Sequence, residues 1–211
     1  WRETNAMLKQ LEILFKKYKI DSVKIGMVKD MEMMNALISA LSAERTPLRC
    51  PKIIWDPIIN TSTGFKIHKN FEKEKLISIL KNIYLVTPNI DEAKFLTGIN
   101  DPMEAAKELS KYCNVFLKGG HAEPQAASYK LQEKSLTLGR DYLFTADGKM
   151  FAFRPKKISQ SRKHGSGCVL SSAITANLTN GNNLHRSCLK AKDYVTKFLL
   201  SNKTLLGYHK I

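Results

Sequence analysis

Apolar residues follow two different spacings along this chain of 211 residues. In one kind of segment they lie three and four positions apart with lysine and glutamate between them, which is typical of an amphipathic helix. The segment beginning at Leu184 shows this clearly, with an apolar stripe that runs to Phe198. The predicted helices span 1–19, 31–43, 72–81, 91–96 and 102–112, and two more begin near Gly167 and Leu184.

Short apolar runs separate the predicted helices and indicate β-strands. Several of these runs end at glycine or proline, as at Pro57, where the missing amide donor stops a strand. The pair Asp147-Gly148 stands between the last two runs and is a strong signal for a hairpin. The predicted strands cover 21–28, 52–57, 83–89, 115–120, 141–145 and 149–154.

The alternation of strands and helices predicts an α/β fold. Strands joined through helices form a mainly parallel sheet covered on both faces, so we expect a three-layer αβα sandwich and one domain over residues 1–211. Ligands of such sheets bind beyond the carboxyl ends of the strands. That edge is expected to gather Met27, Asp56, Asn89, Glu92, Gly119 and the turn at 165–168.

Charge and composition narrow the function without fixing it. The chain has 34 basic and 19 acidic residues, a net charge of +15, with 43% hydrophobic and 25% charged residues. This balance fits a nucleic-acid binder or an enzyme that attracts phosphorylated substrates. The lysines are scattered and form no tract interleaved with aromatic residues, so we expect no nucleic-acid partner. Nucleic-acid binding is kept as a hypothesis that rests on charge alone.

The sequence lacks the marks of a membrane or secreted protein. No apolar run approaches the roughly 18 residues of a membrane span, and no signal-peptide pattern opens the chain. The four cysteines stand far apart, without the spacing of a zinc site or a disulfide framework. We therefore expect a cytoplasmic protein with no membrane partner.

A glycine-rich turn precedes the helix predicted near residue 167. Gly165 and Gly167 flank Ser166, and Cys168 follows at the start of the helix. Free amide groups at a helix N-terminus bind anions, and glycine lets an anion approach the backbone closely. The helix dipole also lowers the pKa of a nearby thiol, so Cys168 is expected to be partly thiolate near neutral pH. The alternative is a tight turn followed by a cysteine that acts as a small buried apolar residue.

Five short segments place polar side chains and glycines at the expected strand ends and at the glycine turn. They are Lys24-Ile25-Gly26-Met27, Asp56-Pro57-Ile58, Thr87-Pro88-Asn89-Ile90-Asp91-Glu92-Ala93, Lys118-Gly119-Gly120-His121 and His164-Gly165-Ser166-Gly167-Cys168. Taken together, and in this order over nearly the whole chain, they resemble the hydroxymethylpyrimidine/phosphomethylpyrimidine kinases of thiamine biosynthesis. These kinases belong to the ribokinase-like superfamily.

The resemblance implies an activity and a catalytic group. The expected reaction is ATP-dependent phosphorylation of the hydroxymethyl group of the pyrimidine, and then of the resulting monophosphate. Cys168 takes the position of the base that accepts the substrate proton. The backbone amides of Gly165, Ser166 and Gly167 would form the anion hole for the transferring phosphoryl group, whose transfer depends on positioning and charge stabilisation.

The resemblance also implies binding roles for residues at the strand ends. Asn89 and Glu92 would act on Mg²⁺ and the phosphates of ATP through water, as suits an ion that keeps part of its hydration shell. Asp56 would help to hold the same ion. Lys118 and Gly119 would contribute to cofactor binding, and Met27 and Ile58 would line the pyrimidine pocket.

The sequence departs from the family pattern at three places. It has Gly-Ser-Gly-Cys at 165–168 where the family usually has Gly-Thr-Gly-Cys. Family members carry an opening strand, a Gly-Ser-Asp segment and a glutamine that recognise the pyrimidine, so we expect this domain to lack its N-terminal strand and substrate-binding segment. The segment 122–140 is longer than usual and is expected to serve as a flap or an oligomer contact in a homodimer.

Two further functions remain open at this point. A pyridoxal or pyridoxine kinase is the nearest alternative, because kinases with a Gly-x-Gly-Cys turn include enzymes that act on such rings. A non-catalytic ligand-binding descendant of the kinase fold is the other, and it would bind pyrimidine or nucleotide without turnover.

Overall fold

The described residues form a six-stranded sheet in the order β1-β2-β3-β4-β5-β6. The computed structural model describes residues 3–43, 51–59, 72–119, 139–154 and 163–209. The first four strands are parallel, and the last two form the antiparallel hairpin expected around Gly148. The strands are β1 (Ser22–Ile25), β2 (Lys52–Trp55), β3 (Leu85–Val86), β4 (Asn114–Leu117), β5 (Asp141–Phe144) and β6 (Met150–Phe153).

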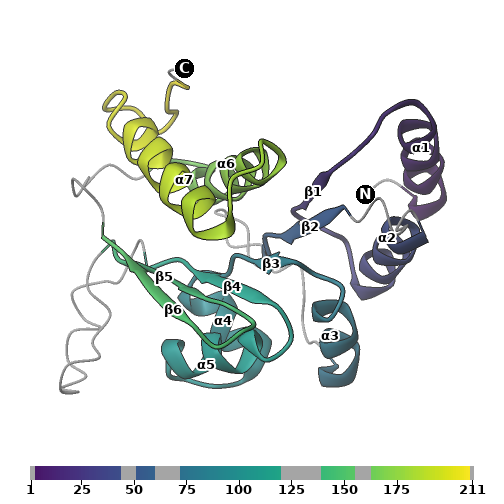
Figure 1. The fold of residues 1–211 in the computed structure, drawn as a ribbon, viewed down its shortest axis with the longest axis horizontal. Helices are drawn as coiled ribbons and strands as arrows, with labels where there is room; N and C mark the ends of the chain where they lie inside the picture. The colour runs from purple at the N-terminus through teal and green to yellow at the C-terminus, as the bar shows by residue number, and fades with distance from the viewer. Residues whose placement is uncertain (1–2, 44–50, 60–71, 120–138, 155–162, 210–211) are drawn as a thin grey trace.

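Helices cover both faces of this sheet, which confirms the three-layer prediction (Figure 1). The parallel strands follow one another in sequence, so their right-handed crossovers leave the connecting helices on the same face. The helices of this first layer are α1 (Thr4–Lys17), α2 (Met31–Ala43), α3 (Lys73–Leu80), α4 (Ile90–Thr97) and α5 (Pro102–Ser110). The helices of the other layer are α6 (Ser166–Thr179) and α7 (Leu184–Leu199).

Successive residues of the central strands pack into two separate cores. In β2, Ile53 and Trp55 face the layer of α1 to α5, whereas Ile54 between them faces α6 and α7. In β4, Phe116 points to the α6 and α7 side between two residues that point away from it. Strands buried on both faces read as continuous apolar runs, which is why the sequence shows them without alternation.

The regular strands are shorter than the sequence predicts, most clearly β3, which has two residues where 83–89 was expected. Pro88 has no amide to give to the ladder. The chain beyond β3 still bonds to both neighbours, because the Thr87 amide donates to Trp55 O and the Lys118 amide donates to Pro88 O. The strand ends therefore stay aligned as irregular segments, at the edge where the site is expected.

Part of the predicted chain lies outside the described residues. This holds for Gly120 and His121 and for nearly all of the expected flap at 122–140. Within the described parts, none of the helices combines the length and apolar character needed to cross a bilayer.

Candidate active site

The N-terminus of α6 presents backbone amides without a side-chain cap. Gly165 is the N-cap and has a left-handed backbone with φ of 76°, which residues with a Cβ adopt only under strain. By contrast, α4, α5 and α7 are capped by the side chains of Asn89, Asp101 and Asn183, whereas α1 and α3 also begin without a side-chain cap. The first amides of α6 are thus available to a ligand, and such a terminus favours an anion.

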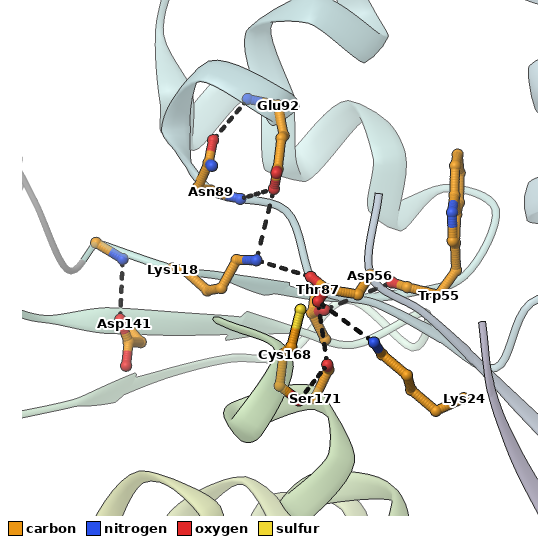
Figure 2. A network of polar contacts seen from close by, with 11 residues as sticks. Lys24, Trp55, Asp56, Thr87, Asn89, Glu92, Lys118, Asp141, Cys168 and Ser171 are labelled. Atoms are coloured by element: carbon orange, nitrogen blue, oxygen red, sulfur yellow. Dashed lines mark hydrogen bonds and ion pairs between the residues drawn. The ribbon is translucent and has the colours of Figure 1, made fainter. Parts of the chain in front are cut away.

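Asp56 is the centre of the polar network beside this terminus (Figure 2). It follows β2 directly and is 1% exposed. Its Oδ1 accepts hydrogen bonds from Lys118 Nζ at 2.8 Å and Thr87 Oγ1 at 3.2 Å. Its Oδ2 accepts from Ser171 Oγ at 3.2 Å and lies 3.8 Å from Lys24 Nζ. One buried carboxylate therefore joins β1, β3, β4 and α6.

Lys118 connects the carboxylates of the site with the glycine turn. Its ammonium lies 2.8 Å from Asp56 Oδ1 and 3.5 Å from Glu92 Oε2, as Figure 2 shows. A Cβ placed on Gly167 would lie 3.4 Å from the same nitrogen. A cation thus stands next to the free amides of α6, which adds a point charge to the anion site.

Asn89 and Glu92 form a capping box at the start of α4. Asn89 Oδ1 accepts from the Glu92 amide at 2.8 Å, and Glu92 Oε2 accepts from the Asn89 amide at 2.7 Å. This pairing explains the Asn-x-x-Glu spacing as a helix start. Glu92 is 7% exposed, and its carboxylate also faces Lys118. Of the two capping-box residues, Glu92 is therefore the one whose side chain joins the polar network around Asp56.

The buried charges of the site stabilise one another. Burial raises the pKa of Asp56, but the ammonium groups of Lys118 and Lys24 outweigh it and leave that pKa below its usual value. Burial lowers the pKa of Lys118, yet the carboxylates of Asp56 and Glu92 raise it overall. Burial raises the pKa of Glu92, and Lys118 offsets this only in part. Asp56 and Lys118 are therefore a charged pair at neutral pH.

The expectation that Cys168 is partly thiolate near neutral pH is wrong for this structure. Burial raises the pKa of the half-buried thiol, and the Asp56 carboxylate raises it further. The ammonium groups of Lys24 and Lys118 lower it by less. Burial and a neighbouring negative charge both disfavour the thiolate form, so a position at a helix N-terminus does not by itself lower the pKa of a thiol.

Gly119 is held in place on the far side of Lys118. Its amide donates to Asp141 Oδ1 at 2.9 Å, and the other carboxylate oxygen of Asp141 pairs with Lys192 of α7. A Cβ on Gly119 would lie 2.0 Å from Arg140 O, so no larger residue fits there. Its observed role is a close backbone approach, and its part in cofactor binding stays a prediction.

Met27 and Ile58 follow the neighbouring strands β1 and β2. Met27 is 46% exposed, and Ile58 is partly buried beyond a tight turn in which its amide donates to Asp56 O at 2.9 Å. Both lie at the carboxyl edge of the sheet, as expected. Their contact with a pyrimidine stays a prediction.

Three members of the network were not expected as site residues: Lys24, Thr87 and Ser171. Lys24 and Thr87 lie within segments quoted for the family resemblance, but a strand lysine and threonine give no signal by themselves. Ser171 is three residues after Cys168, so the helix places both on one face. Its hydroxyl donates to Asp56 and to Cys168 O. The only sequence signal for Ser171 was its position three residues after Cys168 on the predicted helix.

The described residues contain no group of three or more His, Cys, Asp or Glu arranged to hold a metal ion. What the edge does provide is a set of free amides, a partly buried ammonium and two buried carboxylates within one network. This arrangement suits binding and transfer of a phosphoryl group, which depends on positioning and on stabilising negative charge.

Solved structures share this architecture. The phosphomethylpyrimidine kinase from Clostridium difficile 630 has a TM-score of 0.69 and 26% identity, over 93% of this chain and 76% of that chain. The pyridoxal kinase from Staphylococcus aureus, in complex with AMP-PCP and pyridoxal, has a TM-score of 0.72 and 25% identity, over 95% and 69%. Fold and site thus define a kinase of the ribokinase-like class.

Sequence comparison specifies the family. Residues 2–210 match the phosphomethylpyrimidine kinase family, and the chain belongs to it. The hydroxymethylpyrimidine/phosphomethylpyrimidine kinase of Aquifex aeolicus is 30% identical over 210 residues, which cover 95% of this chain and 75% of that protein. The family expected from the five sequence segments and the fold class expected from the alternation of strands and helices are confirmed.

Proposed function

We propose that this chain catalyses ATP-dependent phosphorylation of hydroxymethylpyrimidine and of its monophosphate. The observation that carries the proposal is the uncapped N-terminus of α6, with Cys168 in its first turn and Lys118 Nζ next to Gly167. Family membership supports the reaction type, and the AMP-PCP bound by the related pyridoxal kinase supports a nucleotide donor.

In this proposal the amides of residues 165–167 receive the transferring phosphoryl group. They are preorganised by the glycine turn and neutralise charge that develops during transfer. Lys118 supplies a second positive contact and is kept protonated by the two carboxylates beside it. Asp56 fixes Lys118 and the first turn of α6 relative to each other.

Cys168 is the proposed acceptor of the hydroxyl proton of the substrate. Burial raises the pKa of its thiol, and the Asp56 carboxylate raises it further. A base with a raised pKa holds the proton firmly once it has accepted it, but is ionised in only a small fraction of molecules at neutral pH. The reaction is accordingly expected to accelerate as the pH rises.

Mg²⁺ is the proposed companion of ATP. The ion usually takes one or two protein carboxylates together with phosphates and waters. Asp56 and Glu92 fit this requirement as buried carboxylates in the same network, on either side of Lys118. When bound, the ion would neutralise phosphate charge, and Asn89 would act indirectly by fixing Glu92.

The test is turnover by the full chain with ATP, Mg²⁺ and hydroxymethylpyrimidine, followed by ADP release and by mass spectrometry of the product. Cys168→Ala is expected to lose about 100-fold or more in kcat, the range for a general base. Cys188→Ala, which removes a fully buried thiol of α7, serves as the matched control. Equal rates in the two variants would refute the assignment of the base.

Pyridoxal phosphorylation is the second candidate, because the related pyridoxal kinase binds pyridoxal and shares the fold. Competition between pyridoxal and hydroxymethylpyrimidine in one assay separates the two by their ratio of kcat/KM. Binding of either ring without ADP release would instead support a non-catalytic descendant.

A further inference from the structure

Lys163 is a buried lysine outside the network around Asp56. It is 6% exposed and lies two residues before the N-cap of α6. Its ammonium donates to Asn202 O at 3.0 Å, Asn202 Oδ1 at 2.5 Å and Thr204 O at 2.6 Å. These acceptors are neutral amide oxygens. A full charge is thus taken out of water, and the three hydrogen bonds to these oxygens offset the cost of burying it.

The acceptors belong to a turn that orients them firmly. Asn202 Oδ1 also accepts from the amide and hydroxyl of Thr204 at 3.0 and 3.1 Å. The amide nitrogen of the Asn202 side chain donates to Leu206 O at 2.9 Å. The 202–206 turn therefore presents its oxygens to Lys163 as one preformed unit.

Two further contacts fasten the same turn beside the glycine turn. The amide of His164 donates to Leu205 O at 3.0 Å. A Cβ on Gly207 would lie 2.5 Å from the Phe198 ring and 2.8 Å from Lys163 Cδ, so the backbone there packs directly on both. The segment that enters α6 is thus held through residues 163 and 164, immediately before Gly165.

We propose that Lys163 is a positioning residue of the anion site, because its ammonium clamps the 202–206 turn onto the segment that leads into Gly165. The clamp sets the direction of the free amides at 165–167, which have no side-chain cap to set it. This inference rests on the proposed function, since it assumes that these amides receive phosphate. It assigns to Lys163 no contact with substrate.

The first experiment measures phosphate binding in the full chain through the backbone NMR signals of Gly165 and Gly167. Titration with inorganic phosphate is expected to shift both signals in the wild type. In Lys163→Ala the dissociation constant is expected to rise about tenfold or more, since small misplacement of binding groups has large effects. Lys203→Ala, an exposed lysine on the same turn, is the matched control and should bind as the wild type does.

The second experiment separates positioning from general stability. If turnover is measurable, Lys163→Ala should lower kcat by about tenfold or more with the KM for the pyrimidine nearly unchanged, because the amides act on the transferring group. Methylammonium should restore part of the loss by donating to the vacated oxygens. Tetramethylammonium has no N–H donor and should restore nothing at equal ionic strength.

Asn202→Ala provides a second route should Lys163→Ala not fold. It removes an oxygen that accepts from the ammonium and the amide that donates to Leu206 O, and should weaken phosphate binding. Lys203→Ala on the same turn should again bind phosphate like the wild type. Wild-type phosphate affinity in Lys163→Ala or in Asn202→Ala would overturn the positioning role. An absent response of the wild-type glycine signals would contradict the anion site itself, and hence the proposed function.

Discussion

At the scale of single residues, opposing influences act on the thiol of Cys168. Burial and the Asp56 carboxylate raise its pKa, and Lys24 and Lys118 lower it by less. If the thiolate is the base, kcat/KM should increase with pH, and the rise should lie above the ionisation of an ordinary thiol near pH 8.5. A pH–rate profile of the full chain measures this.

A variant of Lys24 tests whether the neighbouring charges set the pKa of Cys168. Because the ammonium of Lys24 lowers the pKa of Cys168, Lys24→Met should move the rising limb to higher pH. Cys168→Ser should lose the limb, since a serine hydroxyl does not ionise in this range. A profile that is flat between pH 7 and 10 in the wild type would exclude Cys168 as the titrating base.

Asp56 ties the stability of the site to its charge. Its pKa is lowered in the folded state, so its contribution is present above the unfolded carboxyl pKa of about 3.9 and is lost as the pH falls through the lower folded value. Asp56→Asn leaves Lys118 with only Glu92 and should reduce the free energy of unfolding by about 3 kcal/mol at pH 7.

Urea unfolding at several pH values checks this prediction. The difference between wild type and Asp56→Asn should shrink as the pH falls below about 3.9, because the unfolded chain then takes up a proton at Asp56 before the folded chain does. Asp147→Asn, on the exposed turn of the hairpin, is the control and should leave stability nearly unchanged at both ends of the range. A difference that is constant with pH would mean that charge is not what Asp56 contributes.

At the scale of elements, two glycines with the same backbone conformation separate strain from function. Gly165 begins α6 with φ of 76°, and Gly98 ends α4 with φ of 73°. A Cβ has open space at both positions. Gly165→Ala and Gly98→Ala should each cost about 1–2 kcal/mol of stability from left-handed strain.

Only the alanine at 165 should also weaken anion binding, because Gly165 precedes the uncapped amides of a helix start, whereas Gly98 stands at a helix end. Calorimetric titration with MgADP measures the affinity, and thermal unfolding measures the shared loss of stability. Equal affinities in the two variants would show that the turn at α6 is an ordinary helix start.

The helices and strands themselves were predictable because their signals are local. Apolar spacing located each described element, and the Asp147-Gly148 pair located the hairpin. Strand lengths were overestimated. Residues 87–89 continue along the neighbouring strands and bond to them, but they lie outside the regular ladder. The Asn-x-x-Glu spacing of Asn89 and Glu92 was noted for its chemistry, and the structure shows that it also forms the capping box of α4.

At the scale of the whole molecule, pairings between distant residues could not be predicted. Asp56, Glu92 and Cys168 were expected at one edge from the parallel topology, and the structure brings them together beside Lys118. That Ser171 would bond to Asp56 across 115 positions depends on how α6 lies on the sheet. The pair of Asp141 and Lys192 joins residues 51 positions apart, and Lys192 reads in the sequence as one more polar residue of a helix.

This last pair fastens α7 to the sheet and to the loop at Gly119. Asp141 and Lys192 are 6% and 8% exposed, and Lys192 also donates to Gly139 O at 2.8 Å. Breaking a buried pair by removing one partner costs about 3–5 kcal/mol because it leaves the other charge unpaired. Lys192→Met and Asp141→Asn should each destabilise the chain by about this much. The double variant should recover most of the loss, since asparagine still accepts from Gly119.

A double-mutant cycle in urea at pH 7 measures the coupling energy between Asp141 and Lys192. Repeating the unfolding at lower pH tests whether that coupling comes from their charges. Burial raises the pKa of Asp141 even with Lys192 present. Without Lys192 the carboxylate should protonate more readily still, so the penalty of Lys192→Met should diminish as the pH falls. Additive losses in the cycle would show that the two charges do not stabilise each other, and that the apolar contacts made by α7 residues such as Cys188 and Ala191 hold α7 on the sheet.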